Sequence, residues 1–228
     1  MSGWTRFAAI VRKDLVRELR TRDMLLSMTL FVLLAMVVFH FAFSAREEAD
    51  LTYYTGGMLW VIFILAMLLG LNRSFAAERE ERCLDGLLLC PVDRVTIFWA
   101  KTAGNLIFLL AIQAVAIPIF TLLFVERSYL GDLPLFIAVV LLADLGICAL
   151  GTLLATISMQ TRSRDLLLPI VFLPLIVPVL IAATAATTLI FAEEAGLHDL
   201  LARLLFLLGF DAVFLVAAWG TYDFVIGE

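Results

Sequence analysis

The sequence predicts an all-α integral membrane protein with about six transmembrane helices. Of its 228 residues, 63% are hydrophobic and 16% are charged, whereas soluble domains hold about 45–50% apolar and about 25% charged residues. The apolar residues gather in runs that are continuous rather than alternating, which excludes a membrane β-barrel. We therefore expect a single transmembrane domain over residues 1–228.

Six apolar runs are the expected spans. The second run is short for a span unless residues 51–55 extend it. Lys and Arg residues gather before the first run, between the second and third, and between the fourth and fifth. This asymmetry places both termini and those two connections in the cytoplasm. The runs occupy residues 24–43, 56–71, 103–125, 133–157, 166–191 and 200–219.

Residues 1–23 predict an amphipathic helix that lies on the cytoplasmic leaflet before the first span. Its apolar residues recur at three- and four-residue spacing, and its basic residues fall mostly on other faces. A simple membrane anchor is one interpretation, and an elbow helix that also touches a cytoplasmic partner is the other. The apolar set is Trp4, Phe7, Ala8, Val11, Leu15 and Leu19.

Residues 72–94 form the longest polar segment and predict a cytoplasmic coupling helix. Acidic residues come early in the segment, an apolar stripe comes late, and a proline ends it. Such a helix presents one face to a cytosolic partner, although a solvated linker without a partner is the alternative. The expected contact residues are Phe75, Glu78, Glu80, Leu84, Asp85, Leu87, Leu88 and Pro91.

Three prolines interrupt the fifth expected span. Pro169, Pro174 and Pro178 each remove a backbone donor, so this helix should be kinked or broken. The kinks either shape a cavity or hinge, or only fit a curved helix between its neighbours. Both interpretations stay open.

Two carboxylates lie near the middle of the fourth and sixth expected spans, Asp144 and Asp211. An ionised carboxylate is expensive there and usually marks a pathway, a pair or a water-filled cavity. If both face one cavity, they would be coupled proton sites of a secondary transporter that needs no ATPase. The structural alternative is that both are protonated and hydrogen-bonded to the backbone or to Asn105 and Gln113.

The sequence contains no constellation typical of catalysis or metal binding. It has no GxxxxGK[ST] phosphate loop, so ATP hydrolysis must belong to another chain. The three cysteines show no ligand spacing and are expected to be free thiols. We expect a non-catalytic chain with no metal site and no nucleic-acid partner.

These segments together resemble the haem exporter protein B family, the cytochrome c maturation protein B permeases of ABC-type transporters. The likeness covers nearly the whole chain: the charged amino-terminal helix, the six spans, residues 75–91 after the second span, and the proline pattern from Pro169 to Pro178. Within residues 75–91, Cys83 and Cys90 depart from the residues that are usual in the family. An acidic helix followed by Leu-Leu-Leu-x-Pro is shared more loosely by other ABC exporters.

The resemblance implies a membrane permease subunit of the bacterial inner membrane that works in a multi-subunit complex. Its partners would be an ABC ATPase that uses ATP and Mg, a haem-handling membrane subunit, a small single-span subunit and a haem chaperone. A second copy of the chain is a further open partner, and the lipid bilayer surrounds the subunit. The complex would serve cytochrome c maturation, through haem export or release of the haem-loaded chaperone, and a passive assembly scaffold is the remaining alternative.

No bound cofactor is expected in this chain, although the complex handles haem. Haem iron takes axial His, Met or Cys ligands, and the two histidines are His40 and His198. Both fall toward the outer face, His40 between two phenylalanines at interface depth and His198 in a polar loop. We therefore expect no axial histidine ligation of haem by this subunit.

Overall fold

The computed structural model describes residues 3–44, 52–80, 93–125, 129–159, 164–192 and 196–225. Within these residues, six helices are long and apolar enough to cross a membrane. The prediction of an all-α membrane protein with six spans is confirmed. The elements are α1 (Gly3–Thr21), α2 (Asp23–Ser44), α3 (Thr52–Glu80), α5 (Arg94–Phe124), the 3-10 helix η1 (Leu130–Asp132), α6 (Leu133–Met159), α7 (Arg164–Phe191) and α8 (Leu197–Val225).

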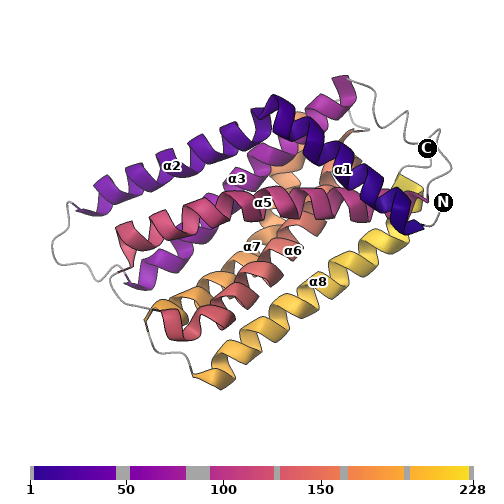
Figure 1. The fold of residues 1–228 in the computed structure, drawn as a ribbon. Helices are drawn as coiled ribbons and strands as arrows, with labels where there is room; N and C mark the ends of the chain where they lie inside the picture. Colours follow the sequence, from indigo (N-terminus) through magenta and orange to yellow (C-terminus); the bar gives the residue numbers. More distant parts are fainter. Residues whose placement is uncertain are drawn as a thin grey trace.

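The six long helices form one bundle around α3 (Figure 1). Helix α3 packs against α7, α2 and α6, and α6 packs in turn against α7 and α8. Within the span, 72% of α3 is buried, compared with 22% of α2 and 17% of α8. Helix α3 is therefore the centre of the bundle, and α2 and α8 lie at its periphery.

Close helix packing at the centre depends on a small residue in α3. A Cβ added at Gly56 would lie 2.8 Å from the backbone oxygen of Thr184 and 2.6 Å from Oγ1 of Thr188. Both threonines belong to α7, so the missing side chain lets the two backbones approach. Deeper in the same interface, the indole Nε1 of Trp60 donates a hydrogen bond of 2.9 Å to Oγ1 of Thr187.

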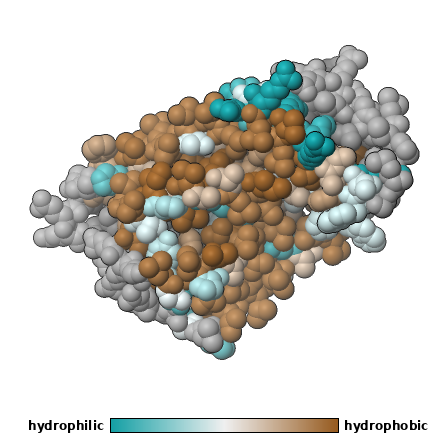
Figure 2. Space-filling view, in the orientation of Figure 1, coloured by the Kyte–Doolittle hydropathy of each residue, from teal (hydrophilic) through white to brown (hydrophobic). Residues whose placement is uncertain are grey.

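Hydrophobic residues cover most of the visible surface of the bundle. Figure 2 shows a broad hydrophobic area over the helices, with strongly hydrophilic residues gathered near α1. Large apolar side chains on the peripheral helices are exposed, among them Leu34 on α2 and Val213 on α8. An apolar surface of this extent suits contact with lipid rather than water.

Several helix boundaries differ from the expected runs, most of all in α3 and α5. Helix α3 begins at Thr52, so residues 52–55 do extend the second span, and it continues to Glu80. Helix α5 begins at Arg94 rather than at residue 103. No Gly or Pro interrupts either extension, and Ala, Glu and Arg favour helix. The polar segment 72–94 is therefore partly taken up by the ends of two helices.

Helix α1 crosses the end of the bundle at which both described chain ends lie (Figure 1). The turn into α2 is made at Arg22, which has a φ of 59°, the left-handed conformation that commonly ends a helix. The carboxylate of Glu18 accepts a hydrogen bond of 2.8 Å from the backbone N–H of Leu25. This contact satisfies one of the donors that the start of α2 leaves free.

The buried side of α1 agrees only in part with the expected apolar face. Phe7 and Val11, two members of the expected apolar face, pack in a cluster formed by α1 with α5, α6 and α8. Ile10 is the most buried residue of α1, although the expected set omits it. In contrast, Trp4 and Leu19 are 76% and 63% exposed. The helix therefore buries a narrow stripe and leaves apolar side chains at both of its ends outside the bundle.

Candidate functional site

A buried ion pair joins α1 to α5. Nζ of Lys101 lies 2.8 Å from Oδ2 of Asp14, and the two side chains are 5% and 13% exposed. The other carboxylate oxygen of Asp14 lies 3.1 Å from Nζ of Lys13, which is 38% exposed. The lysine of α5 thus has its charge balanced inside the bundle by the amphipathic helix.

The predicted coupling segment connects directly to this junction. Phe75 is only 6% exposed and packs in the main core, whereas Glu78 and Glu80 lie in the last turn of α3. The segment leads into α5, whose first two turns reach Lys101. The other predicted contact residues, Leu84, Asp85, Leu87, Leu88 and Pro91, lie outside the described residues.

Asp144 forms a buried hydrogen bond between α6 and α5. Its Oδ1 accepts a bond of 2.8 Å from Nε2 of Gln113, and its residue exposure is 0%. Asn105 does not contribute to this pair, because its Nδ2 donates to Oγ1 of Thr152 instead, at 3.0 Å. Of the two amides expected to bond the intramembrane acids, Gln113 therefore bonds Asp144, whereas Asn105 bonds Thr152.

Asp211 meets α6 from a different helix. It is 3% exposed, and a Cβ added at Gly146 of α6 would lie 2.5 Å from its Oδ1. Neither oxygen of Asp211, nor Oδ2 of Asp144, has a hydrogen-bond partner among the described residues. Asp211 of α8 therefore lies against Gly146 of α6, whereas Asp144 belongs to α6 and is hydrogen-bonded to α5.

The three prolines lie within one continuous helix, α7. The structure therefore excludes a broken fifth span. Phe172 and Ile176 face the core with 0% and 1% exposure, whereas Pro174 is exposed and lies on another side of the helix. Whether the prolines shape a hinge or only fit a curved helix to its neighbours stays a prediction.

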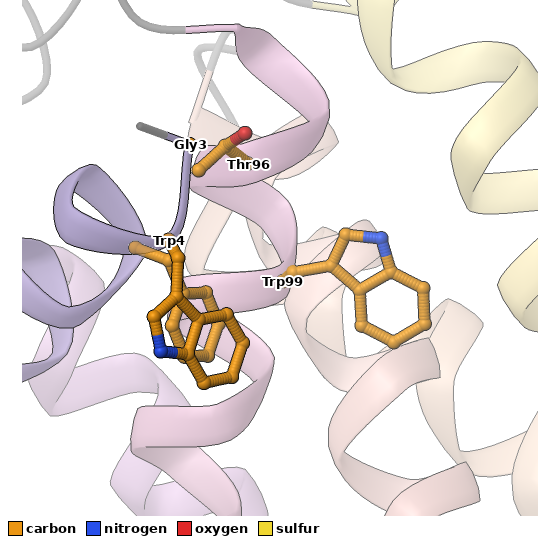
Figure 3. Close-up of a pocket in the computed structure, with 5 residues that line it drawn as sticks. Gly3, Trp4, Thr96 and Trp99 are labelled. Atoms are coloured by element: carbon orange, nitrogen blue, oxygen red, sulfur yellow. The ribbon is translucent and has the colours of Figure 1, made fainter. Parts of the chain in front are cut away.

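An apolar pocket opens where the start of α1 meets the start of α5. Its volume is about 360 Å³. Figure 3 shows the indole rings of Trp4 and Trp99 on two sides of this space, with Thr96 above them. Gly3 and Phe7 complete the lining, and the ring of Phe7 stacks on that of Trp4 at a centroid distance of 5.3 Å.

The two histidines occupy different surroundings. The ring of His40 is half-buried in α2, with its centroid 6.0 Å from that of Phe124 and 5.9 Å from that of Phe41. The side chain of His198 is 99% exposed in the first turn of α8, 4.0 Å from a carboxylate oxygen of Asp199. His40 thus has the aromatic neighbours expected of a ring at interface depth.

Sequence reasoning did not find the Asp14 and Lys101 pair. A signal for it exists, because Lys101 is one of only two lysines in the chain and is followed directly by an apolar run. A lone cation at that depth needs a partner. The partner lies 87 residues away in the sequence, so only the packing of α1 on α5 identifies it.

Comparison with known proteins matches the chain over almost its full length. The profile of a family described as CcmB protein matches residues 5–222. A heme exporter protein B of Rhodobacter capsulatus is 30% identical over 151 residues, which cover 66% of this chain and 68% of the relative. A heme exporter protein B of Bradyrhizobium diazoefficiens is 31% identical over 188 residues, which cover 80% and 81%. One from Pseudomonas aeruginosa is 26% identical over 156 residues, covering 68% and 69%.

Proposed function

The chain belongs to the CcmB protein family, and on that premise we propose that it is the membrane subunit of a haem-export system. The observation that carries the proposal is the profile match over residues 5–222, which includes all six candidate spans. The relatives that bear the name heme exporter protein B support the same role. In this proposal, haem is handled by a multi-subunit assembly rather than by this polypeptide alone.

Energy for this export comes from a separate ABC ATPase in our proposal. The sequence lacks a phosphate loop, so a nucleotide would be bound by a partner chain. Helix α3 has 29 residues and α5 has 31, which correspond to lengths of about 43 and 46 Å. Both exceed the hydrocarbon thickness of about 30 Å, so their ends can carry the segment between them beyond the bilayer core.

The segment 72–94 is the proposed contact with that ATPase. Leu84, Leu87 and Leu88 would dock in a groove of the partner, with the acidic residues of the segment at the rim. Each buried leucine stabilises by about 1.5–3 kcal/mol, compared with about 0–1 kcal/mol for a salt bridge at the rim. Phe75 is buried in the core, so in this proposal it anchors the base of the segment instead of touching the partner.

In this proposal, the ion pair of Asp14 with Lys101 transmits movement of the ATPase contact from α5 to α1. Movement of the segment would act first on α5, which begins at Arg94. Because Lys101 holds Asp14 at 2.8 Å, α1 would move together with this end of α5. The amphipathic helix then serves as an elbow that links the ATPase contact to the membrane surface.

We further propose that both termini are cytoplasmic and that the membrane is the bacterial inner membrane. Support comes from the distribution of Lys and Arg and from the position of both described chain ends at one end of the bundle. Reporter fusions after Glu48, Tyr129 and Glu194 should read as external, and those after Arg82 and Arg164 as cytoplasmic. One reversed connection contradicts this orientation.

The assembly would serve cytochrome c maturation, with a haem-handling membrane subunit, a small single-span subunit and a haem chaperone as further members. Adding ATP to the purified complex should then release the haem-loaded chaperone. A passive scaffold predicts no effect of ATP on the complex. A secondary transporter that uses Asp144 and Asp211 predicts function without any ATPase.

The test of the ATPase contact is co-purification with a double variant, Leu84→Glu with Leu87→Glu. Loss of two buried leucines should cost at least about 3 kcal/mol, or roughly 100-fold in affinity. The matched control is Leu84→Met with Leu87→Met, which keeps apolar volume and should retain the ATPase. Membrane insertion should be unchanged in both. Retained co-purification of the glutamate variant contradicts the docking proposal.

A further inference from the structure

Two side-chain hydrogen bonds join α5 to α6 inside the bundle. Asn105 donates to Oγ1 of Thr152 at 3.0 Å, and Gln113 donates to Oδ1 of Asp144 at 2.8 Å. Gln113 lies eight residues after Asn105 on α5, and Asp144 lies eight residues before Thr152 on α6. Residues at four-residue steps share one face of a helix, so both bonds fit a single antiparallel register of α5 on α6.

The bond between Gln113 and Asp144 leaves two buried oxygens unsatisfied. Oε1 of Gln113 and Oδ2 of Asp144 have no hydrogen-bond partner among the described residues. Each belongs to one of the two groups that the bond already joins, so each lies next to the bonded atoms. An amide oxygen and an ionised carboxylate oxygen both only accept, and neither can satisfy the other. A proton on Oδ2 changes this, because a carboxylic acid has one O–H donor.

The packed helices offer Asp144 no cation that would balance an ionised carboxylate. The residue is 0% exposed. Lys101 of α5 has its own carboxylate partner in α1. Residues 52–72 of α3 and 166–191 of α7, the spans that pack on α6, contain no charged side chain. An unpaired charge in such a place is expensive, so the surroundings favour the neutral acid.

The other titratable groups near Asp144 supply no positive charge either. Cys148 is a buried free thiol one turn further along α6. Asp211 of α8 lies against Gly146, and helix positions two residues apart do not face the same way. Asp211 therefore meets α6 on another side, and the two acids do not share one proton.

We propose that Asp144 binds a proton and shares it with Gln113 in a closed pair of an acid and an amide. The O–H at Oδ2 of Asp144 donates to Oε1 of Gln113, while Nε2 of Gln113 donates to Oδ1 of Asp144. Both orphan oxygens are then satisfied by one proton, and no covalent bond of the chain changes. The pair fixes the register of α5 on α6 without leaving a charge in the membrane.

A proton suits this site better than a metal ion does. Hard cations such as Ca²⁺ and Mg²⁺ take about six or more oxygen ligands, whereas the pair offers two oxygens that are unpartnered among the described residues. The closed pair also leaves Asp144 no free oxygen for a transported cation. The inference does not depend on the proposed role in haem export, because it concerns only the contact of α5 with α6.

Infrared spectroscopy of the full chain in lipid nanodiscs at neutral pH tests the bound proton. The spectrum of the wild type minus that of Asp144→Asn should contain one carbonyl band of a protonated carboxyl group. Asp211→Asn is the matched comparison, since it removes the other intramembrane acid, and the band of Asp144 should remain in that protein. If Asp144→Asn removes carboxylate bands instead, Asp144 is ionised and the proposal is overturned.

Unfolding by SDS tests the closed pair itself. Asp144→Asn should unfold close to the wild type, because its amide can donate to Oε1 of Gln113 and still accept from Nε2. Gln113→Leu leaves the buried acid without its partner and should lower the folding equilibrium constant roughly tenfold or more. Gln113→Leu with Asp144→Leu leaves no orphan polar group and should recover much of that loss.

Three outcomes of the SDS titrations contradict the closed pair. One is an Asp144→Asn protein as unstable as Gln113→Leu, which would mean that the second hydrogen bond does not form. Another is a Gln113→Leu protein as stable as the wild type. The third is a wild-type stability that rises with sodium or magnesium while that of Asp144→Asn does not, because a metal ion would then occupy the place of the proton.

Discussion

Asp14→Asn removes the carboxylate that faces the buried ammonium of Lys101 while keeping the size of the side chain. Lys101 is 4% exposed and lies 2.8 Å from Oδ2 of Asp14. The buried lysine would then either keep its charge without a partner, with Lys13 and Arg17 repelling it, or lose its proton, and either outcome costs stability. The variant should therefore be destabilised chiefly at the contact between α1 and α5.

The expected loss is about 3 kcal/mol in the free energy of unfolding. Breaking a buried ion pair on one side costs about 3–5 kcal/mol, and the lower end applies because the side chain of Asp14 is 13% exposed. The comparison variant is Lys13→Ala, which removes the second cation that pairs with the carboxylate of Asp14. That pair is 3.1 Å long with its lysine 38% exposed, so its loss should cost about 0–1 kcal/mol.

Unfolding by SDS in mixed micelles, followed by far-ultraviolet circular dichroism, measures both variants. Hydrogen exchange locates the effect: amides of α1 should exchange faster in Asp14→Asn, while those of α3 should be protected as in the wild type. Asp14→Leu combined with Lys101→Met is the third variant. Because it leaves no buried charge behind, its stability should return close to that of the wild type.

Two results would refute this reasoning. One is an Asp14→Asn protein within about 0.5 kcal/mol of the wild type, which is the range of ordinary surface substitutions. The other is equal destabilisation by Asp14→Asn and Lys13→Ala. Either result would mean that water or another group compensates the charge of Lys101, and the elbow would lose its proposed mechanical link to α5.

Two further predictions concern the centre of the bundle and use the same SDS titration. Gly56→Ala should destabilise by about 1–3 kcal/mol, because its Cβ would lie 2.8 Å from a backbone oxygen of α7, whereas Gly57→Ala meets its nearest atom at 3.6 Å and should be nearly neutral; equal effects contradict the packing. Thr187→Val should cost about 1–3 kcal/mol, since it leaves the buried N–H of Trp60 without its acceptor at 2.9 Å. Thr187→Ser keeps the hydroxyl and should lose clearly less, so a serine variant as unstable as valine argues against the hydrogen bond.

The sequence alone was sufficient for the six spans and for the family. Apolar length predicts a span because every backbone polar group must be satisfied within a helix in lipid. Five of the six expected runs lie inside helices of the structure, and the third passes the end of α5 by one residue, Val125. The boundaries were less accurate. Lys101 interrupts the apolar pattern near the start of α5, so hydropathy places that start at residue 103, whereas the helix begins at Arg94.

The candidate site was only partly predictable. The leucines and acids of segment 72–94 predict a partner contact, which stays a prediction, and Phe75 falls in that group only because it stands beside them in the sequence. The structure places Phe75 in the core instead. Conversely, Ile10 and the pair of Asp14 with Lys101 were not expected. Their roles depend on where α1 lies on α5, which local spacing in α1 cannot specify.

The sequence by itself determined which segments cross the membrane, that an amphipathic helix precedes them, and which chemistry the chain lacks. Only the tertiary structure decided which side of each span faces the core, that Gln113 rather than Asn105 bonds Asp144, and that Gly56 lies against α7. The physical reason is that lipid and protein core are both apolar. A span therefore carries little periodic contrast between its two faces, and the choice between them is made by packing with residues far away in the chain.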